Sequence, residues 1–441
     1  MKRTTALILI ILLTFPLLAF DFFFDDVPQR NISFELEGGV QTYFDDGAIT
    51  PLANLTLKAE QDGANYRAIA EVSYDSQTEK LEAQELSVSL FMGSYTLKAG
   101  LMRHSWGTAD VAHVVDIVNG RDLRKGIIDD LEKMKRPDWM ITLSKYWENS
   151  AFDVVLKPGF NPSHVSMEGR YSMLKPLDPL MQQMIASGAV NALDLTKIEV
   201  SEMDTFALKR VSGGARYRFL FDPVDVGFLY YTGYFQDPGF DLTFSGVAYP
   251  NPPYDLDKID IVYTRYQLVG VTSSYFFEPF TFNFEGGMFI SEDSKGTNPG
   301  LYNSKLVYLA ELSYTNPNNS LFMAFNYQGQ MVLNYDPDPT VMPPVLDVDF
   351  LAAFNYRPYQ NNFTLAIEVP FFRERMKARL AGMYQLESTG YTILAALSYE
   401  FDDNVSVFGK STVYGTIEDR MGLYNTWKDN SWIQVGVRAW F

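Results

Sequence analysis

The sequence contains no cysteine and only three histidines among its 441 residues. Without cysteine there are no disulfides, thiolate metal sites, cysteine nucleophiles or lipid-bearing N-terminal cysteine. The few histidines leave little imidazole for metal binding or acid–base catalysis. We therefore expect a protein that has no metal, no cofactor and no enzymatic activity.

Basic residues are also scarce. Lys and Arg number 36 against 54 Asp and Glu, which gives a formal net charge of −18. A phosphate backbone repels such a chain, so no nucleic-acid partner is expected. The mean hydropathy of −0.10 excludes a bundle of transmembrane helices. Aromatic residues, by contrast, are abundant: 33 Phe, 27 Tyr and 6 Trp make up 15% of the chain, a content that excludes disorder.

The first twenty residues resemble an export signal in composition. Lys2 and Arg3 precede a short apolar run over 6–15, and a small residue, Ala19, follows. The pattern predicts a cleaved signal peptide over 1–20 and a single domain over 21–441. An N-terminal membrane anchor is the alternative. An exported, cysteine-free, acidic and aromatic-rich chain indicates a bacterial envelope protein.

Past residue 30 apolar and polar residues alternate. In the last segment Ile433, Val435, Val437, Ala439 and Phe441 share one face. Successive strand side chains point to opposite faces, so each such run predicts a strand with one apolar face. Most runs have nine to fifteen residues, which suits the roughly 9–11 residues that a tilted strand needs to cross a bilayer. The nineteen runs lie near 31–42, 51–60, 64–74, 83–92, 94–102, 138–147, 150–158, 204–220, 223–235, 258–277, 279–290, 302–315, 319–333, 346–357, 361–370, 376–387, 390–401, 404–415 and 431–441.

A sheet can span a membrane only when it is closed, because no water in the bilayer core satisfies free backbone amides. Bacterial single-chain barrels have an even number of strands, so one of the nineteen runs must be false. We predict an all-β fold, a transmembrane antiparallel up-and-down β-barrel of about 18 strands with short loop helices; sixteen strands is the alternative. The expected location is the bacterial outer membrane, with its lipid as the surrounding partner.

Two long connections interrupt the strands, at 103–137 and 159–203. Connections of this length are usually functional or disordered. The second contains a predicted helix within 177–197. Counting from a periplasmic N-terminus places 103–137 after the fifth strand, at the outer end. It either folds into the barrel and narrows the lumen, or caps the mouth and lines the wall.

Within the first connection, Trp106-Gly107 is followed by Asp110, Asp116, Asn119 and Asp122-Leu123-Arg124. This block resembles a segment of porin-like bacterial outer-membrane proteins. The final Phe441, preceded by alternating apolar residues, resembles the terminal strand signal that barrel-assembly machinery reads. The resemblance implies an outer-membrane barrel with a transport role, the barrel-assembly machinery as a partner, and no catalytic residues. Trp106 and Gly107 are either the anchor of the loop or a simple tight turn.

Charged strand residues should face water, because Lys or Arg facing lipid at the bilayer centre costs about 2–4 kcal/mol. Arg216 and Arg218 form the sharpest basic pair, and we hypothesise that it attracts anions. For most other charged strand residues we favour a simpler role, which is solvation of the wall and cross-strand pairing. The candidates for lining or constricting the pore are Arg103, Asp110, Asp116, Arg121, Asp122, Arg124, Arg216, Arg218, Arg265 and Glu285.

The leading functional interpretation is a porin-like channel for passive diffusion of small solutes, with a homo-oligomer as a possible assembly. A barrel that transports hydrophobic substrates or lipids is one alternative, and a surface adhesin or structural barrel is another. Ser105 beside His104 is weak evidence for a hydrolase, because neighbouring side chains on a strand or turn point apart. His113 and His164 lack the spacing of a zinc site.

Overall fold

The computed structural model describes most of the barrel and part of its loops. The predicted signal peptide and almost all of the helix expected in 177–197 lie outside the described residues. These are 29–128, 131–166, 169–172, 175, 186, 199–206, 208–245, 255–318, 320–335, 347–353, 357–418, 420 and 422–441.

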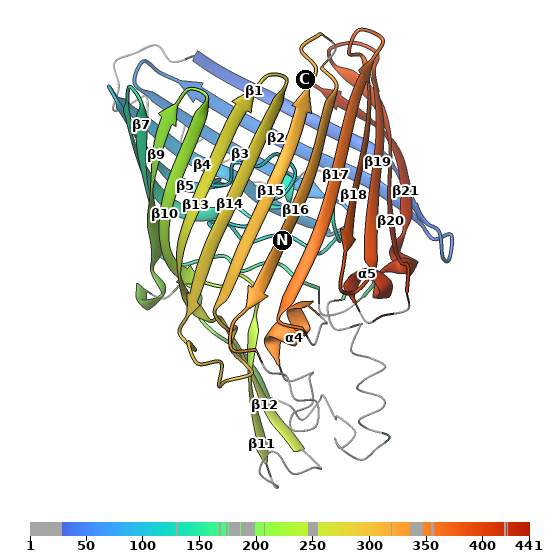
Figure 1. Cartoon of the computed structure of the whole chain (residues 1–441). Helices are drawn as coiled ribbons and strands as arrows, with labels where there is room; N and C mark the ends of the chain where they lie inside the picture. Colours follow the sequence, from blue (N-terminus) through green and yellow to red (C-terminus); the bar gives the residue numbers. More distant parts are fainter. Residues whose placement is uncertain are drawn as a thin grey trace, which may run out of the picture.

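Eighteen antiparallel strands form one sheet that closes on itself (Figure 1). The first strand pairs with the last, from Glu35 opposite Trp440 to Tyr43 opposite Trp432. This confirms the predicted barrel of 18 strands. The strands are β1 (Gln29–Tyr43), β2 (Ile49–Asp62), β3 (Tyr66–Asp75), β4 (Lys80–Met92), β5 (Tyr95–Met102), β6 (Asp138–Trp147), β7 (Ser150–Lys157), β9 (Ser212–Phe221), β10 (Val224–Tyr234), β13 (Arg265–Phe277), β14 (Phe280–Ser291), β15 (Lys305–Thr315), β16 (Phe322–Val332), β17 (Tyr359–Phe371), β18 (Met376–Gln385), β19 (Gly390–Glu400), β20 (Val405–Thr416) and β21 (Trp432–Trp440).

The two ends of the barrel differ. One end has the short turns and the C-terminus, and the other has the long connections (Figure 1). The long connections contain the helices α2 (Leu131–Met134), α4 (Val348–Ala353) and α5 (Leu423–Thr426) and the 3₁₀ helices η2 (Leu208–Arg210) and η4 (Lys428–Asn430). They also contain a separate three-stranded sheet of β8 (Glu199–Glu202), β11 (Gly239–Ser245) and β12 (Asp255–Val262), which the sequence patterns did not predict. No helix among the described residues is both long and apolar enough to cross a membrane.

The predicted strand over 346–357 is wrong, because this run contains helix α4. Asp347 begins the helix: its carboxylate accepts the N–H groups of Asp349 at 2.9 Å and Phe350 at 3.1 Å. Val348 and Phe350 are buried, so their alternation with aspartates reflects the packing of one helical turn. Without this run, eighteen of the nineteen predicted strands remain, which is the even number expected of a closed barrel.

The wall has an apolar outer face and a polar inner face. On β14, Phe280, Phe282 and Phe284 are exposed, whereas Asn283 and Glu285 are buried. Exposed apolar rings alternating with buried polar groups are the reverse of a soluble sheet. They are typical of a barrel whose outside faces lipid.

The closing seam depends on a close approach of two strands. Gly39 of β1 lies opposite Gly436 of β21. A Cβ atom at Gly39 would lie 2.3 Å from the carbonyl oxygen of Val435 and 2.8 Å from the Cα of Gly436. Both obstacles are backbone atoms, so they cannot move aside without shifting a strand.

We predict that Gly39→Val lowers the yield of closed barrel by roughly half or more, because the added atoms overlap the facing strand. Heat-dependent migration of the protein on detergent gels measures the folded fraction. Gly38→Ala is the matched control, since the nearest atom to a Cβ there is 4.0 Å away. Wild-type folding of Gly39→Val would contradict the close packing of the seam.

Candidate functional site: the lumen and its inner loop

The connection between β5 and β6, residues 103–137, enters the barrel. Trp106 is fully buried and packs edge-on against Tyr231, with 6.0 Å between ring centroids. The loop residues Val115 and Val118 belong to the same core. Their wall partners are Met140, Val155, Leu229, Tyr231, Tyr266, Leu268, Phe289 and Val307. The first half of the loop therefore lies against the inner wall from β6 to β15.

Glu285 on β14 holds this half of the loop in place. Its Oε1 accepts the N–H groups of Thr108 at 2.7 Å and Ala109 at 3.2 Å. Its Oε2 accepts those of Val114 at 2.9 Å and Val115 at 3.3 Å. Glu285 is 0% exposed. A carboxylate is stable so deep in a protein only when several donors replace its water, and the loop supplies them.

Glu311 on the neighbouring strand β15 binds the tip of the same loop. It accepts the N–H groups of Asp110 at 2.6 Å and Val111 at 3.2 Å. The wall residues Asn283 and Asn326 donate to it at 3.1 and 3.2 Å. Two adjacent buried carboxylates thus bind six backbone amides of the loop. The predicted pore residue Asp110 contributes to this attachment through its backbone N–H group.

Two buried cations on β9 and β7 bind backbone carbonyl groups of the same loop. Arg216 donates to the oxygen of Trp106 at 2.8 Å and pairs with Asp153 at 3.2 Å. Lys157 donates to the oxygen of Val118 at 2.6 Å and pairs with Asp138 at 2.7 Å. Because Arg216 lies beneath Trp106 and faces a carboxylate, it acts as an anchor for the loop.

The other strand candidates are distributed differently. Arg218 is partly exposed and lies 3.5 Å from the same Asp153 carboxylate that Arg216 binds. Arg265 begins β13 on the side of the exposed Val269, whereas Tyr266 and Leu268 are buried toward the lumen. The alternation therefore places Arg265 on the outer side of the wall, and the expected luminal position does not agree with the structure.

The two ends of the loop are joined by Asn119. Its Oδ1 accepts the N–H of His104 at 2.8 Å, and its Nδ2 donates to the carbonyls of Met102 at 3.2 Å and Arg136 at 2.8 Å. Next to it, Asp116 accepts the N–H of Trp106 at 2.9 Å. These contacts fix the position of the indole ring.

Gly107 allows the loop to fold tightly after Trp106. A Cβ atom there would lie 2.1 Å from Nδ1 of His113. That same Nδ1 is 3.2 Å from Oε1 of Glu285. Gly107 thus leaves room for the imidazole of His113 to reach the carboxylate of Glu285. Trp106 anchors the loop by packing against the wall, and Gly107 anchors it by allowing this contact of His113.

The second half of the loop reaches the opposite wall. The N–H of Ile127 donates to the hydroxyl of Tyr414 on β20 at 3.1 Å. Tyr171, Tyr414, Tyr424 and Trp427 form an aromatic cluster there, and Ile127 packs against it. Residues 103–128 therefore cross the lumen from β14 and β15 to β20. Arg121 lies in the crossing segment, where its backbone pairs with Lys135 and its N–H donates to Ser163 at 3.2 Å.

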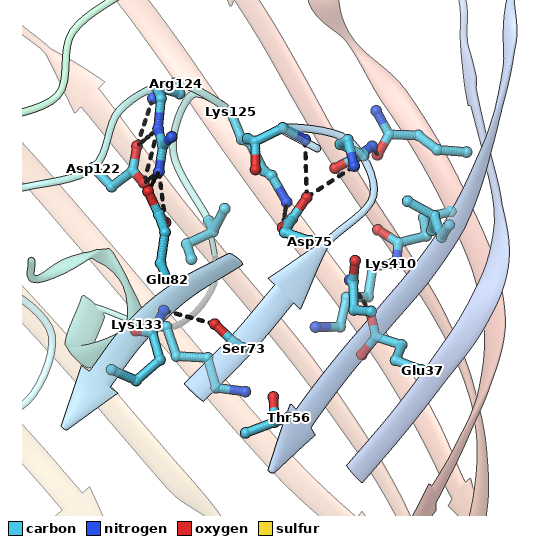
Figure 2. Close-up of a pocket in the computed structure, with 18 of the residues that line it drawn as sticks. Glu37, Thr56, Ser73, Asp75, Glu82, Asp122, Arg124, Lys125, Lys133 and Lys410 are labelled. Carbon is cyan, nitrogen blue, oxygen red and sulfur yellow. Dashed lines mark hydrogen bonds and ion pairs between the residues drawn. The ribbon is translucent and has the colours of Figure 1, made fainter. Parts of the chain in front are cut away.

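Opposite charges stabilise the crossing segment along the wall of β3 and β4. Arg124 binds Asp122 and also Glu82, the latter at 3.0 Å, and Lys125 binds Asp75 (Figure 2). Burial raises the pKa of Asp122, but the hydrogen bond and charge of Arg124 outweigh it and hold that pKa below its usual value. Asp122 therefore remains ionised at neutral pH and keeps Arg124 in place.

A cavity of about 960 Å³ remains between the loop and the wall formed by β1–β4 and β18–β21. Of the predicted pore residues, Arg103, Asp122 and Arg124 line this cavity. The cavity lining does not include Asp110, Asp116, Arg121, Arg216, Arg218, Arg265 or Glu285. Its acidic lining residues are Glu35, Glu37, Glu71, Asp75, Glu82 and Asp122, and its basic ones are Arg103, Arg124, Lys125, Lys133, Lys135, Arg136, Arg170, Arg379, Lys410 and Arg438.

Ser105 is hydrogen-bonded to Lys135 instead of to a histidine. The Lys135 ammonium also pairs with Asp116 and Glu132, each at 2.5 Å. An ammonium held by two carboxylates has no free electron pair with which to activate a serine. Ligand atoms of Asp116, Glu132 and His113 lie within 4.8 Å of one another, a grouping that their spacing did not suggest. Two members of this group, Asp116 and Glu132, are already paired with the ammonium of Lys135.

Replacing Glu285 should release the loop from the wall. We predict that Glu285→Ala accelerates amide hydrogen exchange over 108–115 about tenfold or more, because four N–H groups lose a charged acceptor. Mass spectrometry of the folded protein measures this exchange. Glu368→Ala is the control, because Glu368 is a half-buried residue of β17 with no hydrogen bond to the loop among the described residues. Equal exchange in both variants would contradict the anchoring role.

His113 makes the attachment depend on pH. Burial lowers the pKa of this histidine, but the hydrogen bond and charge of Glu285 outweigh it and raise that pKa above 6.5. Protonation of His113 therefore strengthens the attachment of the loop at pH values below the raised pKa. This gain in stability is lost as the pH rises through that pKa. We predict that protection of the 108–115 amides, corrected for intrinsic rates, falls over the pH range above 6.5, where the imidazole with the raised pKa loses its proton.

His113→Gln should remove this dependence. His104→Gln should keep it, because burial lowers the pKa of His104 to about 4 and that ring is neutral throughout the range. The same pH profile in wild type and His113→Gln would show that the imidazole does not hold the loop.

No family model matches the chain, and no curated protein matches its sequence. Among solved structures, OccK5 (OpdH) of Pseudomonas aeruginosa matches with a TM-score of 0.50 and 9% identity, over 94% of this chain and 98% of that chain. OmpT of Vibrio cholerae without loop L8 matches with a TM-score of 0.42 and 8% identity, and a double mutant of Rh. blastica porin with 0.41 and 11%, each over 94% of this chain and 100% of that chain. The last two scores are too low to add support. The match to OccK5 shows that the chain has the barrel fold of an outer-membrane channel.

Proposed function

We propose that this protein is an outer-membrane channel through which small polar solutes diffuse passively. The solute path runs along the cavity between loop 103–137 and the wall of β1–β4 and β18–β21. The observation that carries the proposal is the extent of this cavity along β1, where Glu35, Glu37, Gln41 and Tyr43 all line it. The eight residue steps from Glu35 to Tyr43 span about 27 Å along the strand, or about 20 Å along the barrel axis at the usual strand tilt, which is most of the roughly 25 Å height of the apolar band of such barrels.

The chemistry of the lining supports a polar solute. Charged and amide side chains along the cavity replace the water that a polar solute loses on entering a narrow space. The same groups have no favourable contact to offer a hydrocarbon chain. The cavity therefore favours diffusion of polar solutes over the alternative of hydrophobic or lipid transport.

The loop gives the channel its width. It covers one side of the lumen through the apolar core around Trp106 and crosses to Tyr414. Without it, an 18-stranded barrel would have a much wider lumen. We infer that the attached loop sets the size limit for solutes.

The absence of cysteine allows a direct test of the path. Thr56 on β2 lines the cavity (Figure 2), and Thr56→Cys introduces a unique thiol there. We predict that a charged methanethiosulfonate reagent lowers the conductance of this variant in a planar bilayer by roughly half, because the adduct narrows the path.

Leu312→Cys is the matched control, because Leu312 is exposed on the outer face of β15 and its adduct should leave the conductance unchanged. The proposed function fails if folded wild-type protein forms no conducting pore, or if modification at position 56 has no effect on an open one.

A further inference from the structure

Arg265 faces outward at the end of the wall that has the long connections. It is exposed, and so are Gln267 and Val269 on the same face of β13. Its guanidinium forms no ion pair or hydrogen bond with the residues that the structure describes. A charged group on the lipid-facing side needs a polar partner, because the hydrocarbon of the bilayer offers neither water nor a counter-charge.

The length of β13 indicates the depth of Arg265 in the membrane. The strand has 13 residues and ends at Phe277, an exposed aromatic residue at the opposite rim. The steps between these two residues span about 41 Å along the strand, or about 31 Å along the barrel axis at the usual tilt. The apolar band of such barrels is roughly 25 Å tall, and aromatic residues mark its borders. Arg265 therefore lies at the outer border, at the depth of the lipid headgroups.

A second arginine lies at the same edge of the wall, where β9, β10 and β13 are neighbours (Figure 1). Tyr234 of β10 is the cross-strand partner of Arg265. The guanidinium carbon of Arg210 in η2 lies 5.5 Å from the centroid of the Tyr234 ring, and Arg210 donates to the Tyr234 hydroxyl at 3.5 Å. Phe160 stacks on the same ring, with 5.1 Å between centroids. Arg210 and Arg265 therefore flank one firmly packed tyrosine.

Carboxylates do not neutralise these arginines. Within the described ranges neither Arg210 nor Arg265 forms an ion pair, and the exposed Lys209 beside Arg210 forms none either. Glu292 follows β14 opposite Arg265, and its carboxylate accepts the backbone N–H of Arg265 at 2.7 Å. Three basic side chains thus keep their charge at one edge of a protein whose formal charge is −18. They create a local positive potential that attracts anions.

A polar pair lies next to this edge, one step closer to the centre of the membrane. The Tyr230 hydroxyl donates to Oε1 of Gln267 at 3.2 Å. The NH₂ group of Gln267 has no partner among the described residues. Farther from the edge, Phe228 and Val269 are exposed and apolar. From the edge inward the surface thus offers cations, then an amide, then hydrocarbon, which is the order of groups in a phosphate-bearing lipid.

We propose that this face of β10 and β13 binds the phosphate headgroup of a lipid in the outer leaflet, with Arg210 and Arg265 as its ligands. A phosphate accepts two hydrogen bonds from one planar guanidinium, and the second arginine balances its remaining charge. Gln267 donates to the polar group below the phosphate, and the acyl chains lie along Phe228 and Val269. The inference requires a barrel in a membrane but does not depend on the proposed channel function.

Native mass spectrometry of the folded protein in detergent micelles tests this site. The probes are diphosphoryl lipid A and the same lipid without its phosphates. Wild type should bind the diphosphoryl form about fivefold or more tightly than the other form, because only phosphate makes charge-assisted hydrogen bonds to the arginines. The double variant Arg210→Gln/Arg265→Gln should lose most of this difference.

Arg373→Gln/Arg375→Gln is the matched control. Both arginines are exposed in the turn between β17 and β18, at the opposite end of the barrel. In a micelle they are as accessible to lipid as the proposed site, and they add the same charge. The control variant should therefore bind diphosphoryl lipid A as wild type does. Heat-dependent migration on gels shows whether each variant is folded.

Equal binding of the two lipids by wild type, or wild-type affinity in the double variant, overturns the inference. An equal loss of affinity in the control variant also overturns it, because binding would then follow net charge. Release of the lipid by an equal concentration of inorganic phosphate would indicate a site for a free anion and would overturn the lipid as its occupant. None of these results bears on conductance, so the proposed function is tested separately.

Discussion

The arrangement of the lumen depends on the contact between two buried carboxylates and the backbone of one loop. A peptide segment inside a barrel loses water from its N–H groups, and each buried donor without an acceptor costs about 1–3 kcal/mol. Glu285 and Glu311 supply acceptors for six of these groups. The contact is mutual, because the same N–H groups allow both carboxylates to be buried in the wall.

The rest of the site follows from this contact. With residues 108–115 on the wall, Trp106 is buried among apolar side chains and the chain continues across the lumen to Tyr414. The space that remains lies against β1–β4 and β18–β21. Ten basic and six acidic side chains line this space, although the chain as a whole is acidic.

The strands were predictable from sequence because alternation is a local property of each run. The run over 346–357 failed because one helical turn with two buried apolar residues gives the same short pattern. Arg265 shows the related limit: a charge at a strand end can lie on either face, and only the neighbours Tyr266 and Leu268 establish which face is inward.

The site itself was less predictable, because it depends on contacts far apart in sequence. Thr108 and Glu285 are 177 residues apart, and Asp110 and Glu311 are 201 residues apart. Sequence reasoning assigned Glu285 to the pore lining and missed Glu311, which binds the same loop. The sequence did contain one indication of this contact: Glu285 and Glu311 are carboxylates on the polar faces of two consecutive predicted strands, where a buried acid needs hydrogen-bond donors.

Solid-state NMR of the protein in lipid tests the central contact most directly, by measuring dipolar couplings between the side-chain carboxyl carbon of Glu285 and loop amide nitrogens. The account predicts couplings to the nitrogens of Thr108 and Val114, whose N–H groups donate to opposite oxygens of this carboxylate at 2.7 and 2.9 Å. A carboxyl carbon coupled only to water, with no loop nitrogen nearby, would contradict it.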